Sequence, residues 1–349
     1  MNQPATRVVD IHSHTYPRWY IELLKERTEI PRVSGAEGDE RFVIFPEETI
    51  TGGVGGRPMS DDYWSIDAKL RFMDRNGIDQ TVLSLGNPWL EPFTPAASLE
   101  AARRINAEFA AFRRQTKGRI LGMGALPGGS PADVVTVVEE IAAEPELHGT
   151  VSGTHIAGRS LDDAALDPVW AALERTGLPL LIHPHHGSAM NELSGFGHAL
   201  PVAVGFPLET TVAVTRLVFA GVLHRYPDLK IVASHGGGTI PFLAGRLDAG
   251  WRSDAHLVER APTTPGDVLD KLFLDAVLYH PRALRAAADL VGVGQMAYGT
   301  DHPFSISDPA ANRAALAEAF DSKEVVQVLA GTAIDLFSVP EPEERAPAS

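Results

Sequence analysis

The stretch Val8-Val9-Asp10-Ile11-His12-Ser13-His14 decides how the rest of the chain is interpreted. Its β-branched residues and short apolar run predict a buried strand. Because side chains alternate across a strand, His12 and His14 lie on one face together with Asp10. Two imidazoles on one face at a strand end can hold one metal ion. The alternative is a pair of polar residues in a loop, so the remaining sequence has to decide between the two.

Short apolar segments alternate with helical patterns along the chain. After the first, the expected strands are residues 80–85, 119–126, 148–155, 178–183, 229–234, 272–276 and 295–300. The expected helices are residues 65–76, 98–116, 131–143, 163–176, 208–226, 239–252 and 281–291. Strict alternation of strand and helix predicts a parallel sheet in an α/β fold. Eight such units predict a closed (β/α)8 TIM barrel.

Residues 28–64 interrupt the alternation. They look irregular and become glycine-rich toward Gly55-Gly56-Arg57-Pro58. Loops of this length are usually lids or binding loops, so we expect a lid insertion after the first strand. The chain is then a single barrel domain over residues 1–339. The tail, residues 340–349, consists mainly of Pro, Glu and Ala and is expected to be disordered.

Composition restricts the partners and the location. The 349 residues carry a formal net charge of −15, which argues against nucleic acid or an anionic membrane as a partner. The chain has no cysteine, which excludes disulfides, a thiol nucleophile and a thiolate metal site. The N-terminus lacks the basic and long apolar regions of an ordinary signal peptide. No apolar run approaches the roughly 20 residues of a membrane span. The expected location is the cytoplasm.

Histidine or aspartate follows four of the expected strands. In a parallel barrel the active site lies at the carboxyl ends of the strands, so these side chains should meet at one opening. The four clusters are His12-Ser13-His14, His183-Pro184-His185-His186, Ser234-His235-Gly236 and Gly299-Thr300-Asp301-His302. A metal centre is therefore expected there.

The residue types narrow the choice of metal. Three imidazoles and one carboxylate suit zinc, with manganese or another first-row divalent ion as the alternative. Two-metal barrels of this build usually bridge their ions with a carboxylated lysine at the end of the fourth strand. Residues 147–161 contain no lysine, which favours a single ion. No glycine-rich nucleotide fingerprint or P-loop is present, so no organic cofactor is expected.

Longer motifs around these residues resemble a known family. They are the opening His-x-His, Ile182-His183-Pro184, His235-Gly236-Gly237-Gly238 continuing to Phe242-Leu243-Ala244-Gly245-Arg246, and Gly299-Thr300-Asp301-His302-Pro303-Phe304. Over nearly the whole chain they are similar to the aminocarboxymuconate-semialdehyde decarboxylase family of the amidohydrolase superfamily. Asn87-Pro88-Trp89, His183-Pro184-His185 and the motifs within residues 197–211 look more like isoorotate (uracil-5-carboxylate) decarboxylases.

The resemblance implies roles for individual residues. The implied ligands of one metal ion are His12, His14, His183 and Asp301. His235 is implied to be a catalytic histidine, and Arg57 to meet the substrate carboxylate. A homodimer is also implied, because in the muconate enzyme the neighbouring subunit supplies an arginine at the position of Arg246. The tryptophan-bearing loop of that enzyme is replaced here by His185-His186-Gly187, which puts a muconate substrate in doubt.

Further residues are candidates for the substrate pocket. They are Asn87, Trp89, Phe206, His302 and Phe304. Flat apolar rings suit a planar ring or diene, although Phe206 and Phe304 could equally be packing residues. His185 and His186 could support the metal site or be polar loop residues, and a structural role for His155 is at least as plausible as a chemical one.

The predicted reaction is the metal-dependent, non-oxidative decarboxylation of a small planar carboxylate, whether unsaturated, aromatic or heteroaromatic. A metal beside the substrate carboxylate would orient the ring and withdraw charge. The carbon that loses CO2 must gain a proton, which we expect Asp301 to deliver while His235 polarises substrate or water. The competing prediction is hydrolysis of a lactone or amide at the same metal.

Overall fold

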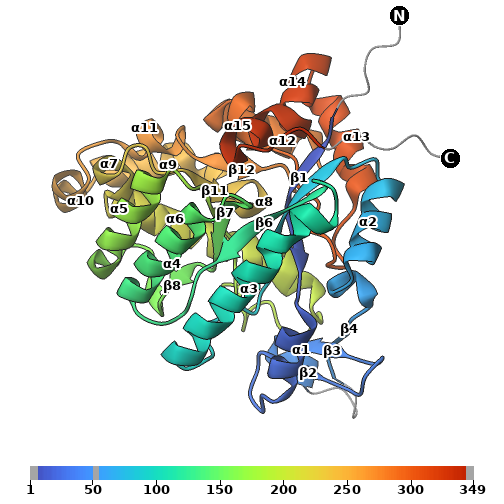
Figure 1. The fold of residues 1–349 in the computed structure, drawn as a ribbon. Coiled ribbons are helices and arrows are strands. Elements are labelled where there is room, and N and C mark those ends of the chain that lie inside the picture. Colours follow the sequence, from blue (N-terminus) through green and yellow to red (C-terminus); the bar gives the residue numbers. More distant parts are fainter. Residues whose placement is uncertain (1–6, 50–54, 343–349) are drawn as a thin grey trace, which may run out of the picture.

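A sheet of eight parallel strands forms the centre of the protein, as a computed structural model describes it for residues 7–49 and 55–342 (Figure 1). Its strands, in sheet order, are β1 (Val9–Thr15), β5 (Gln80–Leu85), β6 (Ile120–Ala125), β7 (Leu147–Ser152), β10 (Leu180–Ile182), β11 (Ile231–Ala233), β12 (Phe273–Asp275) and β13 (Met296–Ala297). The end of the sheet returns to its start, because the backbone N–H of Ile11 donates to the carbonyl of Tyr298 at 2.9 Å. The predicted (β/α)8 barrel is confirmed.

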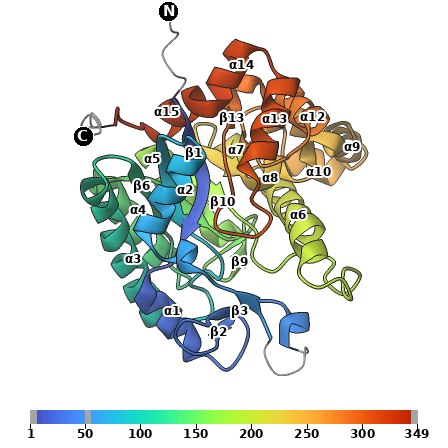
Figure 2. The same ribbon diagram turned by 90° about the vertical axis from the view of Figure 1, so that its right-hand side faces the viewer.

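Helices surround the sheet on its outer side (Figure 2). Those between the strands are α2 (Ile66–Arg75), α3 (Pro95–Gln115), α4 (Pro131–Ala143), α5 (Asp167–Thr176), α6 (Phe206–Phe219), α7 (Val222–Arg225), α8 (Ser234–Gly237), α9 (Ile240–Arg252), α10 (Ala255–Arg260), α11 (Pro265–Leu269) and α12 (Pro281–Val291). After the last strand come α13 (Pro309–Ala319), α14 (Ser322–Val326) and α15 (Thr332–Phe337). The local sequence determines where several helices begin. At the N-terminus of α4, for example, Ser130 and Asp133 form a capping box.

Several expected boundaries differ from the structure by a few residues. The expected helix 208–226 is divided, because Gly221 adopts a left-handed φ of 72° between α6 and α7. The expected last strand, residues 295–300, is reduced to Met296–Ala297. Beyond it, the N–H of Thr300 donates to the carbonyl of His12 at 3.1 Å, so the chain still follows β1 toward the carboxyl end of the barrel.

One helical stretch is long and apolar enough to cross a membrane by composition alone. It covers Pro201–Phe219, with a mean hydropathy of 1.4, and half of it is buried inside the protein. The stretch includes α6, whose Val214 and Leu217 are fully buried in the core. Packing against the barrel therefore accounts for its apolar residues.

The insertion after β1 is more regular than its sequence suggested. Its described part contains a three-stranded antiparallel sheet of β2 (Arg32–Ser34), β3 (Arg41–Val43) and β4 (Arg57–Pro58). Both views place this sheet beside α1 (Arg18–Lys25), at the carboxyl end of β1 (Figures 1 and 2). The buried carboxylate of Glu40 ties it to α1 through ion pairs of 2.9 Å with Arg18 and 3.1 Å with Lys25.

The expected disordered tail lies mostly outside the described residues, in 343–349. Its first residues are held to the barrel, since Arg7 donates a hydrogen bond to the carbonyl of Pro340 at 2.5 Å. Arg7 also forms an ion pair of 3.1 Å with Glu341.

Candidate metal centre and active site

Three buried imidazoles and one carboxylate meet at the carboxyl end of the barrel. His12 and His14 come from β1, whereas His183 follows β10; their ring centroids lie 4.9–5.0 Å apart in every pairing. Their Nε2 atoms lie 3.3, 3.4 and 4.0 Å from Oδ1 of Asp301. All four side chains are at most 5% exposed. The structure thus brings together the four residues expected as ligands.

The opposite nitrogen of each imidazole fixes its protonation pattern. Nδ1 of His12 lies 2.6 Å from Oδ2 of Asp275, that of His14 lies 3.2 Å from the carbonyl of Leu85, and that of His183 lies 2.9 Å from the carbonyl of Pro184. Carboxylate and carbonyl oxygens only accept hydrogen bonds, so neutral His12 and His183 rings carry their hydrogen on Nδ1; Nδ1 of His14 also lies 3.0 Å from the hydroxyl of Ser84, which can accept from it as well. Each Nε2 then presents a lone pair toward Asp301.

These lone pairs suit a metal ion. Within the described chain, the Nε2 atoms of His12, His14 and His183 and Oδ1 of Asp301 are buried without a hydrogen-bond partner. Four convergent atoms of this kind, buried without a hydrogen-bond partner, favour a cation between them. The set of three nitrogens and one oxygen is one that zinc and other first-row divalent ions accept.

The electrostatics of the centre also call for positive charge. Burial opposes protonation of His12, but the carboxylates of Asp301 and Asp275 outweigh it and raise its pKa to about 10. Burial lowers the pKa of His14 to about 4 and that of His183 well below its ordinary range. Without a metal ion, the site therefore favours one positive charge on His12 itself, which a bound metal ion would replace. The other two rings stay neutral, as metal ligands must be.

His235 lies beside this group. Its Nε2 is 3.6 Å from Oδ2 of Asp301, and its backbone N–H donates to Oδ2 of Asp275 at 2.8 Å. Ligand atoms of His12, His183, His235 and Asp301 all lie within 4.8 Å of one another. His235 is thus close enough to exchange a proton with Asp301 or to approach the metal.

Strained backbone holds the two catalytic candidates in place. His235 has a φ of 54° and Asp301 a φ of 59°. These values lie in the left-handed region, which residues other than glycine rarely adopt. Gly236 between β11 and α9 has a φ of 62°, and a Cβ there would lie 2.5 Å from the side chain of Leu278. Below Asp301, the carboxylate of Asp10 accepts hydrogen bonds from the backbone N–H groups of His12 and Thr300.

A narrow cavity opens on this centre, and several expected residues line it. Its walls are Arg57, Asn87, His183, Val202, Phe206, Asp301, Phe304, Ser305 and Ile306. The ring of Phe304 lies 5.3 Å from that of His14. Asn87 is also held by the loop after β10, because its Nδ2 donates to the carbonyl of His185 at 3.1 Å.

Trp89 and His302, which were expected in the pocket, do not line this cavity, and Arg246 was expected to serve a neighbouring subunit. Trp89 is buried behind His183, with ring centroids 5.7 Å apart. Arg246 is exposed on α9 and does not line the cavity of its own chain. His302 faces away, because its ring stacks on Phe72 at 3.6 Å and its Nδ1 accepts a hydrogen bond from the buried amine of Lys69 at 2.5 Å.

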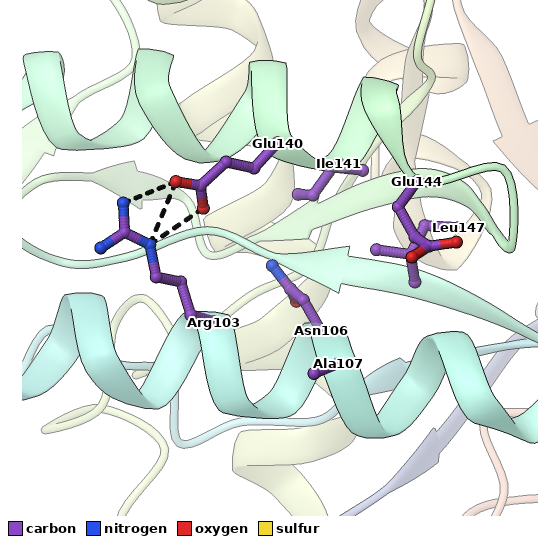
Figure 3. A pocket seen from close by; sticks show the side chains of 7 residues that line it. All are labelled: Arg103, Asn106, Ala107, Glu140, Ile141, Glu144 and Leu147. Carbon is purple, nitrogen blue, oxygen red and sulfur yellow. Dashed lines mark hydrogen bonds and ion pairs between the residues drawn. The ribbon is translucent and has the colours of Figure 1, made fainter.

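A larger hollow lies on the outside of the barrel, between α3 and α4 (Figure 3). Arg103 of α3 points across it toward Glu140 of α4, with which it forms an ion pair of 2.5 Å (Figure 3). Asn106, on the same helix, is bonded to the backbone of Ala125. Arg103 and Glu140 are thus paired with each other and Asn106 with the backbone, and none of the residues that line this hollow belongs to the metal centre.

Several functional side chains were not predicted. Asp275 orients His12 and His235, Lys69 holds His302, and Glu48 pairs with Arg57. For Asp275 a signal existed, because a carboxylate at the end of an otherwise apolar strand is costly to bury without a function.

Together, the closed barrel and the buried group of three imidazoles and one carboxylate define a metal-dependent barrel enzyme. A family model described as Amidohydrolase matches residues 9–339, and the chain belongs to this family. The family expected from the motifs is thereby confirmed.

Several known proteins similar to the chain are decarboxylases by name. One of them is IDCase, an isoorotate decarboxylase from Metarhizium anisopliae, which is 35% identical to this chain in sequence. Its crystal structure superimposes with a TM-score of 0.90, over 97% of this chain and 98% of the IDCase chain. The 2-amino-3-carboxymuconate-6-semialdehyde decarboxylase of Dictyostelium discoideum is 27% identical over 305 residues, which are 86% of this chain and 82% of the relative. A dihydroxybenzoic acid decarboxylase from Polaromonas, solved with manganese and 2-nitroresorcinol, shares the fold at 20% identity and a TM-score of 0.77, covering 95% and 97% of the two chains.

Proposed function

We propose that this chain is a metal-dependent, non-oxidative decarboxylase of a planar unsaturated, aromatic or heteroaromatic carboxylate. The observation that carries the proposal is the position of the metal centre at one end of a cavity that Arg57, Phe206 and Phe304 also line. A planar acid can place its ring between the phenylalanines and its charge toward the arginine and the metal. The named relatives catalyse this class of reaction on acids of that kind.

The proposal assigns one divalent ion to His12, His14, His183 and Asp301, with zinc favoured by the three nitrogens and manganese as the alternative. Such an ion would orient the substrate carboxylate and its neighbouring oxygen and draw electrons from the ring. No organic cofactor is needed for this chemistry.

The protein's own groups supply the proton. When the bond to the carboxylate breaks, CO2 leaves and the electron pair remains on the ring carbon, which then takes a proton. We assign Asp301 as the donor. As an ionised carboxylate it first takes a proton from His235 across the 3.6 Å between Nε2 and Oδ2, and then delivers that proton to the carbon. Arg57 holds the substrate charge, and Asn87 lies on the same wall.

A substrate panel tests the reaction class. Purified protein reconstituted with zinc or manganese is offered uracil-5-carboxylate, hydroxybenzoates and a muconate semialdehyde, beside lactones and amides. Mass spectrometry then distinguishes loss of CO2 from gain of water. Turnover of at least one acid with release of CO2 is expected, and His183→Ala serves as the metal-free control. Turnover of lactones or amides alone would favour the competing hydrolase.

The proposal includes a homodimer acting in the cytoplasm. Arg246 is exposed on α9, beside Phe242, which is 88% exposed. In a dimer, Arg246 would serve the cavity of the neighbouring copy. Sedimentation should give twice the chain mass, and Arg246→Ala should lower kcat/KM without loss of metal. Arg252→Ala, on the same helix, is the matched control; equal effects of both variants would remove Arg246 from the site.

A further inference from the structure

The strongest remaining feature is a buried ion pair inside the insertion that follows β1. Oε1 of Glu48 lies 2.7 Å from Nε of Arg57, with side chains 7% and 13% exposed. The ring of Phe45 lies on another side of the same guanidinium, with its centroid 5.5 Å from Cζ. Arg57 also lines the substrate cavity, so it is held from inside the insertion while it faces the site.

Glu48 is itself fixed by backbone. Its second oxygen, Oε2, accepts hydrogen bonds from the N–H groups of Ile44 and Phe45, at 2.7 and 2.9 Å. The short segment η1 (Pro46–Thr49) that carries Glu48 therefore folds back onto the end of β3. Because these backbone hydrogen bonds fix the carboxylate, its Oε1 holds the guanidinium of Arg57 in one position.

The backbone that carries Arg57 is equally constrained. Arg57 pairs with Phe42 in the register of β3 and β4. A Cβ at Gly55 would lie 1.9 Å from the carbonyl oxygen of Glu48. Gly56 has a φ of 103°, and a Cβ there would lie 2.5 Å from the carbonyl oxygen of Phe42. Only glycine permits this close approach, which places β4 directly against the segment with Glu48.

From this geometry we propose that Glu48 is a positioning residue, which fixes Arg57 through Nε so that the terminal Nη groups are available to a carboxylate in the cavity. The inference rests on the proposed function only in taking Arg57 as the carboxylate-binding group. An arginine side chain is long and flexible, and ordering it in advance removes an entropic cost from binding. Glu48 thus raises affinity for the acid without touching it.

A purely structural ion pair would predict something different. In that case loss of Glu48 loosens the insertion and reduces affinity for charged and neutral ligands alike. If Glu48 acts through Arg57, the loss should affect carboxylates only and should vanish when Arg57 is absent.

The experiment compares Glu48→Gln, Arg57→Ala and the double variant. Glutamine keeps the size and one acceptor oxygen. When that oxygen accepts from the N–H groups of Ile44 and Phe45, its uncharged NH2 group faces Nε of Arg57, and the ion pair is lost. Salicylate is the carboxylate probe and salicylamide its neutral counterpart, both titrated into zinc-loaded protein. Metal content and circular dichroism are recorded for every variant. Glu40→Gln is the matched control, because Glu40 is also a buried glutamate of the insertion but pairs with Arg18 and Lys25.

We expect Glu48→Gln to weaken salicylate binding roughly tenfold and to leave salicylamide, metal content and fold unchanged. In the double variant, Glu48→Gln should weaken salicylate binding no further than Arg57→Ala does alone. With a turned-over acid, KM should rise while kcat changes little. Unchanged salicylate affinity in Glu48→Gln, an equal loss for salicylamide, additive effects in the double variant, or no salicylate binding by the unaltered protein would each overturn the inference. Absence of CO2 release from every acid would contradict the proposed function instead and leave the binding comparison intact.

Discussion

Replacement of Asp275 by asparagine is the most informative single change near the metal centre. Its Oδ2 accepts hydrogen bonds from Nδ1 of His12 at 2.6 Å and from the N–H of His235 at 2.8 Å. Its Oδ1 accepts from the N–H groups of Gly236 at 2.9 Å and Val277 at 3.1 Å. Four donors thus surround a fully buried carboxylate, two at each oxygen.

Asparagine has the same size as aspartate, but it cannot accept hydrogen bonds from all four of these donors. Either orientation of its amide turns an NH2 group toward two N–H groups, so two hydrogen bonds to a charged acceptor are lost. At about 1.5–3 kcal/mol each, the gross loss is about 3–6 kcal/mol, and local relaxation recovers part of it. The affinity for the metal should fall roughly 10- to 100-fold, which corresponds to about 1.4–2.7 kcal/mol. The reason is that His12 loses the partner that orients its Nε2.

The assay is competition for metal against a chelator, followed by elemental analysis, with circular dichroism to confirm the fold. The value of kcat/KM is then measured at saturating metal, where a loss would report the altered position of His235. Asp162→Asn is the control, because Asp162 pairs with Arg216 at 2.8 Å, and neither residue belongs to the metal centre. An unchanged metal dissociation constant together with an unchanged kcat/KM would refute the role given to Asp275.

Three further outcomes are expected. Elemental analysis of the active protein should give one equivalent of divalent metal per chain, and activity proportional to a second equivalent would contradict this. His183→Ala should lose metal and activity together; full metal retention, measured by the same method, would remove His183 from the ligands. Burial opposes ionisation of Glu40, but hydrogen bonds from Arg18 and Lys25 outweigh it and lower its pKa from 4.5 to about 2. A lowered folded-state pKa stabilises above pH 4.5, and this contribution, at most about 3 kcal/mol, is lost as the pH falls toward 2. The difference in unfolding free energy between the native protein and Glu40→Gln should therefore be constant near neutral pH and shrink below pH 4.5, whereas a pH-independent difference in denaturant titrations would contradict the pKa.

The four residues expected as metal ligands could be predicted from the sequence because each lies in a short local pattern, within or directly after an expected strand. His12 and His14 alternate within one strand, His183 directly follows another, and Asp301 directly follows the last expected strand, residues 295–300. The barrel then brings all strand ends to one opening, so knowledge of the fold class was enough to place them together.

The supporting residues depend on distances between elements, which a local pattern does not contain. Lys69 lies on α2 between Ala68 and Leu70, where a lysine is ordinarily solvated, yet it is 1% exposed and donates to Ser13 at 2.7 Å. The same contact network turns His302 away from the cavity. Neither the burial of Lys69 nor the orientation of His302 could be predicted from the residues beside them in sequence.

Charge balance favours the single divalent ion that we propose for this centre. Three buried carboxylates lie around it in the described chain, those of Asp10, Asp275 and Asp301. Burial raises the pKa of Asp10 to about 6 and lowers that of Lys69 to about 7, and the two groups interact electrostatically. Whether the shared proton sits on one or the other, the pair is neutral. Two negative charges then remain, on Asp275 and Asp301, and one divalent ion compensates them. A second ion would leave two positive charges in a buried site, at a high desolvation cost, and no lysine near the fourth strand is available to be carboxylated and offset it.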